Sequence, residues 1–179
     1  MELNTPTTES EHGEIRSEEH DLSFLGGWLA KGKRVFALLD ACDEPLIPPK
    51  VLSLGNHAVS LYRGSAEQDY SSIAPYVAAV DQELIDWIYE NLDGTPWGYF
   101  ALTEVSCSLH ELRKHFRRFL TVLLPDRRAV LFRFYDPRVI KTFLETADQE
   151  ELRAFFGPVN YFSLTTSDQK KMDLFQRLP

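Results

Sequence analysis

The sequence predicts a single domain of the α/β (or α+β) class, in which a mixed β-sheet is layered with helices. Three observations support this fold class. The chain has 179 residues, which suits one domain that buries about 68–70% of its unfolded surface. Short apolar runs rich in β-branched and aromatic residues alternate with segments of helical periodicity. Two of these runs flank a short polar turn and are typical of a β-hairpin.

The first half of the chain contains three apolar runs with the length of strands. They cover residues 34–40, 58–62 and 75–80. We expect a short helix or lead-in over 22–29. We expect a loop or short helix over 43–55, because Pro48 and Pro49 interrupt that stretch. The polar residues 63–72 are expected to be rich in turns.

The second half begins with a helix over 81–91, since Asp81 is a suitable cap and apolar residues recur along one stripe. Ser108 and Glu111 have the spacing of a capping box, which predicts a helix over 109–119. The remaining elements follow from the same rules. They are strands over 97–102 and 161–164, a hairpin of 120–124 with 129–135, and helices over 137–146 and 148–156.

Residues 130–140 form the most informative stretch of the chain. High β propensity predicts a strand over 129–135, and Asp136 and Pro137 suit the cap and the first position of a helix that follows directly. Arg133 would then share a face of the strand with packed side chains. A guanidinium held there requires an acidic partner, so Arg133→Ala should unfold the domain.

Charge is unevenly distributed along the chain, whose formal net charge is −8. Residues 1–25 hold seven acidic residues against one base, and large apolar residues are scarce before Leu22. Such a segment buries too little surface to offset its ordering cost, so we expect disorder up to Asp21. We therefore expect an acidic disordered tail (1–21), a folded domain (22–165) and a C-terminal segment (166–179).

Composition also indicates which binding partners and which cellular compartment to expect. A pI of about 5.1 argues against general nucleic-acid binding. The sequence has no apolar stretch near the roughly 20 residues that span a bilayer, and its N-terminus lacks the basic and apolar regions of a secretory signal. Cys42 and Cys107 have no metal or redox spacing, which suits a reduced compartment. We expect a cytoplasmic protein that binds neither nucleic acid nor membrane.

Few residues form a pattern typical of catalysis, and we assign no catalytic or cofactor-binding residue. The glycine motifs that bind phosphate groups are absent from the sequence. His110 and His115 fall on different faces of one helix, so we expect solvated histidines and no metal site. Asp40, Asp43 and Glu44 gather near a strand end, where a small hydrolase would place its acids. We favour the alternative, in which they pair with a buried base or lie in a solvated loop.

The helix expected over 109–119 carries four bases opposite its apolar stripe. They are Arg113, Lys114, Arg117 and Arg118. Such a face can dock an acidic protein surface or a phosphate backbone, the latter in a nucleic-acid-associated regulator. It is equally typical of an ordinary solvated helix, and the sequence leaves both interpretations open.

Several short motifs follow one another in an order that characterises a known family. They are FALLDA at 36–41, SLYRGS at 60–65, APYV at 74–77, WGYF at 97–100, LRKHFRRFL at 112–120, LFRFYDPR at 131–138 and FGPV at 156–159. From about residue 34 to 161 the chain resembles the adaptor-chaperone family of bacterial type VI secretion, long known as a domain of unknown function.

The resemblance implies a non-enzymatic protein without a cofactor. Its partners would be a secreted toxic effector and the spike protein at the tip of the secretion tube, to which the effector is handed. In such a protein we expect a structural charge network that fixes strand ends and a helix start. Its members would be Asp40, Arg133, Asp136 and Arg138.

Four further residues are candidates for contact with a partner. They are Tyr62, Arg63, Arg113 and Arg117. Two lie on the basic helix face and two in the polar turn after a short strand, where exposed aromatic and arginine side chains contribute most to binding.

Overall fold

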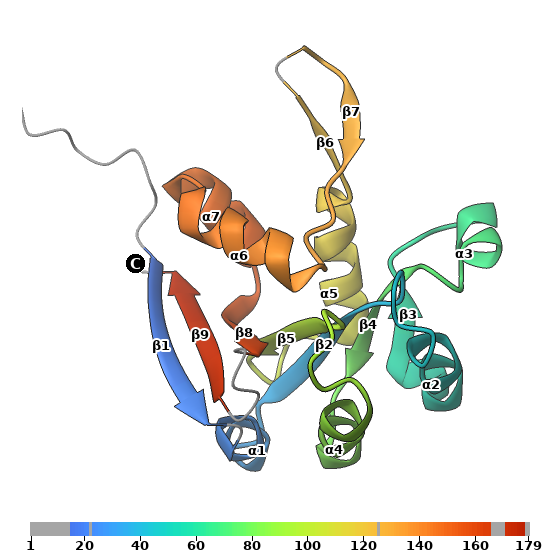
Figure 1. Ribbon diagram of the computed structural model, residues 1–179. Helices are drawn as coiled ribbons and strands as arrows, with labels where there is room; N and C mark the ends of the chain where they lie inside the picture. Colours follow the sequence, from blue (N-terminus) through green and yellow to red (C-terminus); the bar gives the residue numbers. More distant parts are fainter. Residues whose placement is uncertain (1–14, 22, 125, 166–170, 178–179) are drawn as a thin grey trace, which may run out of the picture.

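The computed structural model describes residues 15–21, 23–124, 126–165 and 171–177. At the centre of the domain is an antiparallel sheet of seven strands in the order β1-β9-β8-β5-β2-β4-β3 (Figure 1). The strands are β1 (Ile15–Asp21), β2 (Arg34–Asp40), β3 (Ala58–Ser60), β4 (Pro75–Ala79), β5 (Gly98–Thr103), β8 (Val159–Thr165) and β9 (Lys171–Arg177).

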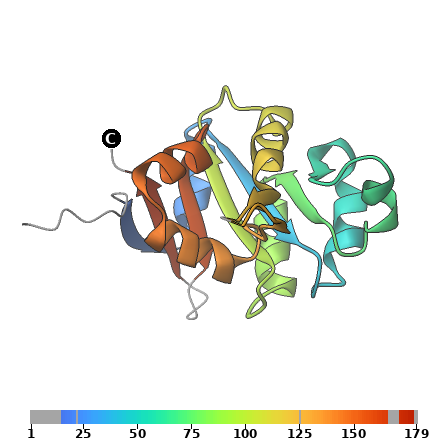
Figure 2. The same ribbon diagram turned by 90° about the horizontal axis from the view of Figure 1, so that it is seen from above.

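Helices cover both faces of this sheet, which gives three layers (Figure 1). One face carries α1 (Ser23–Ala30), α2 (Ile47–Leu54) and α4 (Gln82–Asn91), and the other carries α5 (Leu109–Phe116), α6 (Pro137–Thr146) and α7 (Gln149–Phe156). Figure 2 views the domain from the side of the second group, with the short α3 (Ser65–Asp69) beyond the β3 edge. The predicted class, a single domain with a sheet layered with helices, is confirmed, but the described strands all pair antiparallel, whereas we expected a mixed sheet.

Strand β2 connects the two halves of the core. Its side chains alternate between the faces of the sheet. Val35, Ala37 and Leu39 pack toward α1, α2 and α4, whereas Phe36 and Leu38 pack toward α5, α6 and α7. Because both faces are covered, the strand is an almost continuous apolar run, as the sequence indicated.

The predicted helix starts are confirmed by their caps. Asp81 accepts a hydrogen bond from the Leu84 amide, and Ser108 and Glu111 form the reciprocal capping box at the start of α5. Asp136 caps α6, with Pro137 in its first turn. At α2, Pro48 and Pro49 also occupy the first turn, where a missing amide proton costs nothing.

The expectation of disorder up to Asp21 is wrong for Ile15–Asp21, because these residues form β1. Each of them pairs with a residue of β9, from Ile15 with Arg177 to Asp21 with Lys171. Residues 1–14 lie outside the described residues. The charged side chains that suggested disorder face solvent along a sheet edge, where charge discourages pairing with other chains.

The domain boundary expected at residue 165 also differs from the structure. Strand β9 lies between β1 and β8 within the main sheet, and its Met172, Leu174 and Phe175 are buried. The segment 171–177 is therefore part of the folded core.

The hairpin is present but its second strand is shorter than predicted. β6 (Thr121–Leu123) and β7 (Ala129–Leu131) pair as a separate two-stranded sheet, labelled at the top of Figure 1. The chain leaves the strand after Leu131, since the aromatic side chains that follow turn into the core. Phe134 stacks on Phe116 with ring centroids 5.4 Å apart. Burial of these rings overrides their β propensity.

Candidate functional site

Arg133 lies in the segment between β7 and α6, and not within a strand as the sequence suggested. Its Nη2 donates a hydrogen bond to Oδ2 of Asp40 at the end of β2, over 2.6 Å. Asp40 is only 4% exposed and also accepts a bond from the Cys42 amide, whereas the Arg133 side chain is 36% exposed. Burial by itself would lower the pKa of Arg133, but the bond to Asp40 raises it above its usual range.

Asp136 continues this chain of charges. Arg138 binds it through two side-chain bonds, from Nε to Oδ1 over 2.9 Å and from Nη2 to Oδ2 over 2.6 Å. Nη2 of Arg133 lies 3.9 Å from the same carboxylate. Burial opposes the charge of Asp136, yet the bonds from Arg138 lower its pKa below the usual range. The four residues predicted to form a charge network therefore lie in one series of ion pairs that joins β2 to the start of α6.

This pairing bears on the hydrolase alternative. The carboxylate of Asp40 is buried and bonded to a guanidinium, while Asp43 is exposed in the following loop. A carboxylate fixed in this way braces the strand end and has little access to a substrate or metal ion.

Arg113 joins α5 to the edge of the sheet. Its Nε donates to the carbonyl oxygen of Ser60 over 2.7 Å, and its Nη2 donates to the carbonyl oxygen of Tyr62 over 3.3 Å. Nη2 also lies 3.2 Å from Oε1 of Glu67 on α3. The basic face of the helix is therefore more than a solvated surface, because Arg113 holds the β3–α3 link in place.

Arg117 and Arg63 add two positive charges to the pair of Arg113 and Glu67, and Arg117 interacts electrostatically with all three of the others. Partial burial lowers the pKa of Arg117, and the positive charges of Arg113 and Arg63 lower it further against the opposing effect of Glu67. Arg63 itself is exposed. We call these four residues the guanidinium cluster. It carries more positive than negative charge, so an anionic partner would relieve repulsion within it.

Tyr62 links the guanidinium cluster to the charge network. It is half-buried, and it adjoins Tyr135 next to Arg133. Burial raises the pKa of Tyr135, and the Tyr62 hydroxyl acts in the same direction. The structure thus brings Tyr62, Arg63 and the two arginines of the basic helix segment together on the surface between α5 and α3.

His115 differs from the solvated histidine that we expected. It is buried between α5 and α7, where Nε2 lies 2.7 Å from the carbonyl oxygen of Phe155 and Nδ1 lies 2.7 Å from Nη2 of Arg118. The carbonyl oxygen only accepts and the guanidinium only donates, so Nε2 carries the proton and the ring is neutral. Burial lowers the pKa of His115, and the charge of Arg118 lowers it further.

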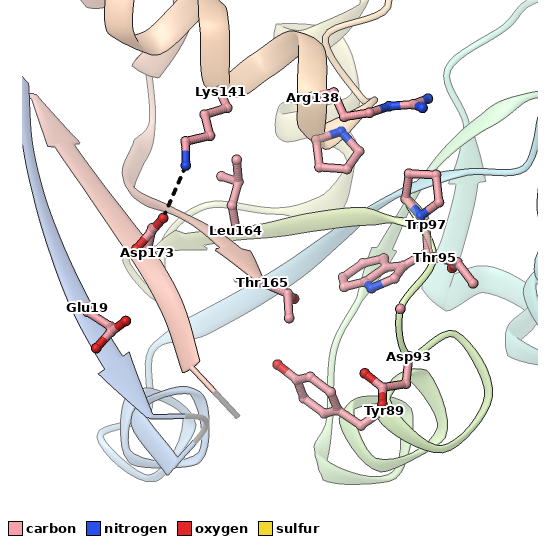
Figure 3. Close-up of a pocket in the computed structure, with 13 residues that line it drawn as sticks. Glu19, Tyr89, Asp93, Thr95, Trp97, Arg138, Lys141, Leu164, Thr165 and Asp173 are labelled. Atoms are coloured by element: carbon pink, nitrogen blue, oxygen red, sulfur yellow. Dashed lines mark ion pairs between the residues drawn. The ribbon is translucent and has the colours of Figure 1, made fainter. Parts of the chain in front are cut away.

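A pocket of about 810 Å³ lies on another side of the charge network (Figure 3). Its walls come from the end of α4, the start of α6 and strands β8 and β9, and Arg138 is part of its lining. Lys141 and Asp173 form an ion pair of 3.6 Å within it. The hydroxyls of Tyr89 and Thr165 are buried and interact with each other. Sequence reasoning missed this pocket, because its lining residues are scattered from β1 to β9.

Sequence reasoning also missed an exposed apolar surface on the β6–β7 hairpin. Leu123 is 73% exposed and Leu131 is 53% exposed. The sequence predicted the hairpin itself, but only the structure shows that it stands apart from the main sheet.

Within 15–21, 23–124, 126–165 and 171–177, His, Cys, Asp and Glu nowhere form a group of three that could hold a metal ion. In the same residues every helix is too short or too polar to cross a bilayer.

Comparison with known proteins gives one match. Neither the curated proteins nor the solved structures include one that matches this chain. A family described as "Domain of unknown function (DUF4123)" matches residues 35–154, which is more than half of the chain. This span includes β2 to β5, the hairpin, the charge network and the guanidinium cluster. The chain therefore belongs to the DUF4123 family.

Proposed function

We propose that this protein is a non-enzymatic adaptor-chaperone, which binds a type VI secretion effector and helps to load it onto the spike protein. Membership of a family without assigned function is compatible with this role, and the ordered motifs that resemble type VI adaptors favour it. The run around Arg133 forms internal ion pairs, so its role is to support the neighbouring surface.

The guanidinium cluster is the observation that carries the proposal. Arg113 pairs with Glu67, Arg117 interacts electrostatically with Arg113, Arg63 and Glu67, and the neighbouring Tyr62 is half-buried. Arginine side chains bind carboxylates in a planar, charge-assisted geometry, and arginine and tyrosine are the residues most often found at the centre of protein interfaces. The cluster is therefore suited to carboxylate side chains of a protein partner.

Co-purification tests the proposal directly. The tagged protein is co-expressed with the effector and the spike protein encoded beside its gene, and the complexes are separated by size-exclusion chromatography. We expect the effector to co-elute with the protein and the spike protein to join that complex. Recovery of the protein alone, with both candidates well folded, would refute the proposed function.

A charge-reversed variant tests the role of the guanidinium cluster. Arg63 is exposed, so Arg63→Glu should fold normally and weaken binding of a carboxylate-bearing partner at least tenfold. Lys31→Glu is the matched control, because Lys31 is an exposed base directly after α1, a helix that packs on the opposite face of the sheet from α5. Equal effects of both variants would show that only net charge matters. Tight binding of duplex DNA that Arg63→Glu abolishes would favour the nucleic-acid alternative instead.

A further inference from the structure

We propose that the β6–β7 hairpin is a docking arm whose apolar face is covered by the effector. This inference rests on the proposed function. The arm comprises residues 117–132: the 3₁₀ helix Arg117–Phe119 at its base, then β6 and β7. Figure 1 shows the hairpin projecting beyond α5, α6 and α7, away from both helical layers.

One face of the arm consists of exposed side chains. Cross-strand pairs place Leu123 opposite Ala129 and Leu131 opposite Thr121, and all four residues are exposed. The alternating residues Val122 and Val130 are half-buried. Two exposed leucines, diagonal to each other on one face of a projecting two-stranded sheet, form the kind of apolar surface that marks a site of protein interaction.

The tip of the arm holds an arginine in an unfavourable backbone conformation. Arg127 has φ = 66°, the left-handed region that glycine and asparagine adopt more easily. Asp126 is paired with Arg128, with 2.6 Å between Oδ2 and Nε. Arg127 is exposed, and it has no charged partner in the described part of the chain. A cation kept at a strained position where glycine would be more stable points to a role for the guanidinium itself.

The charge of the arm defines the chemistry of its partner. Residues 117–132 contain four arginines and one aspartate, in a chain whose net charge is −8. The arm therefore fits a protein surface that carries an apolar strip bordered by carboxylates. Apolar interfaces are typical of lasting complexes, and transient ones are more polar. In the proposed function the effector is bound first and carried to the spike, so its complex with this protein must last longer, and we assign the apolar face to the effector.

Three variants and purified effector test this assignment. In the double variant Leu123→Ser/Leu131→Ser the apolar face is lost, and in Arg127→Gly the guanidinium is lost while the backbone strain is relieved. Leu52→Ser is the matched control, since Leu52 on α2 is 81% exposed but lies on the opposite face of the sheet. All changed residues are exposed, so each variant should retain the native circular dichroism spectrum.

We expect isothermal titration calorimetry to show at least tenfold weaker effector binding for the double variant. Arg127→Gly should bind several-fold more weakly although its melting temperature is equal to or above that of the wild type. The control should bind like the wild type. Spike binding, measured separately, should be unchanged in all three.

The outcomes separate this inference from the proposed function. A wild-type protein that binds neither effector nor spike refutes the proposed function. Normal effector binding by the double variant refutes only the docking arm, and loss of spike binding with the effector retained refutes its assignment to the effector.

Discussion

Arg133 and Asp40 form a short ion pair across 93 positions of sequence, and the carboxylate is the buried partner. The pair joins the end of a central strand to the turn before α6. Its unequal burial means that removing the arginine leaves a buried negative charge, whereas the arginine alone would still contact water.

Arg133→Ala should therefore lower the free energy of unfolding by about 3 kcal/mol, the lower end of the range for a broken buried pair. The measurement is urea denaturation followed by tryptophan fluorescence. Arg128→Ala serves as the control, because Arg128 pairs with Asp126 and both of these side chains are exposed. The double variant Asp40→Ala/Arg133→Ala should lose less than the sum of the two single changes. Full additivity would mean that the pair contributes nothing.

Replacement of Gly157 tests the packing of α7 on His115. Gly157 has φ = 47° at the end of the helix, and a Cβ atom there would lie 2.2 Å from Cε1 of His115. The left-handed conformation alone costs an alanine about 1–2 kcal/mol. Gly157→Ala should therefore lower the melting temperature clearly.

Gly27→Ala is the control for this substitution. Gly27 lies within α1, and a Cβ atom there meets nothing within 4 Å. Alanine favours the helical conformation, so this variant should be as stable as the wild type or slightly more stable. A melting temperature for Gly157→Ala that matches Gly27→Ala would contradict the described contact.

The buried His115 should make stability depend on pH below neutrality. Its pKa is lowered in the folded protein from the ordinary value of 6.5, so the unfolded chain takes up a proton first as pH falls. The contribution of the neutral His115 ring to the free energy of unfolding is fully present above pH 6.5, and it is lost as pH falls from there toward the pKa of His115 in the folded protein.

This effect is measured as the unfolding free energy at several pH values. His115→Gln should be less stable at neutral pH but should lack the part of the pH dependence due to His115. His110→Gln changes an exposed histidine and should keep the wild-type profile. The lowered pKa of Asp136 acts in a separate window, below its ordinary value of 3.8. Identical profiles for His115→Gln and wild type would contradict the buried neutral ring.

The two cysteines should differ in reactivity. Cys42 is exposed, whereas Cys107 is buried and burial raises its pKa. Because the thiolate is the reactive form, a thiol reagent should modify Cys42 quickly and Cys107 only after unfolding. The measurement is the absorbance of the coloured thiolate that a disulfide reagent releases on reaction with a cysteine, in native and in denaturing buffer. In Cys42→Ser the fast phase should disappear, and its persistence would show that Cys107 is accessible.

Local patterns predicted those parts of the fold that local forces determine. Helix starts at Asp81, Ser108 and Asp136 depend on bonds between neighbouring residues, so the sequence alone placed them well. Apolar strands such as β2 were visible because both faces of the sheet are covered. The pairing of β1 with β9 was not predictable in this way, since β1 is mostly charged and its order comes from backbone bonds to a distant strand.

In the candidate site, too, local sequence patterns predicted some features, and contacts between distant residues determined the others. The need of Arg133 for an acid could be stated from the sequence, and Asp40 is that acid. The end of β7 was misplaced because the burial of Phe134 against Phe116 is a tertiary effect. His115 was misjudged for a similar reason: its burial comes from α7, which lies 40 positions away at Phe155.

The register of the outer strands has a consequence during synthesis. Ile15 pairs with Arg177 and Asp21 with Lys171, so β1, the first described strand, cannot pair until β9, the last one, has been synthesised. While translation proceeds, its amide and carbonyl groups stay hydrated, and that half of the sheet closes only after residue 177 has emerged from the ribosome.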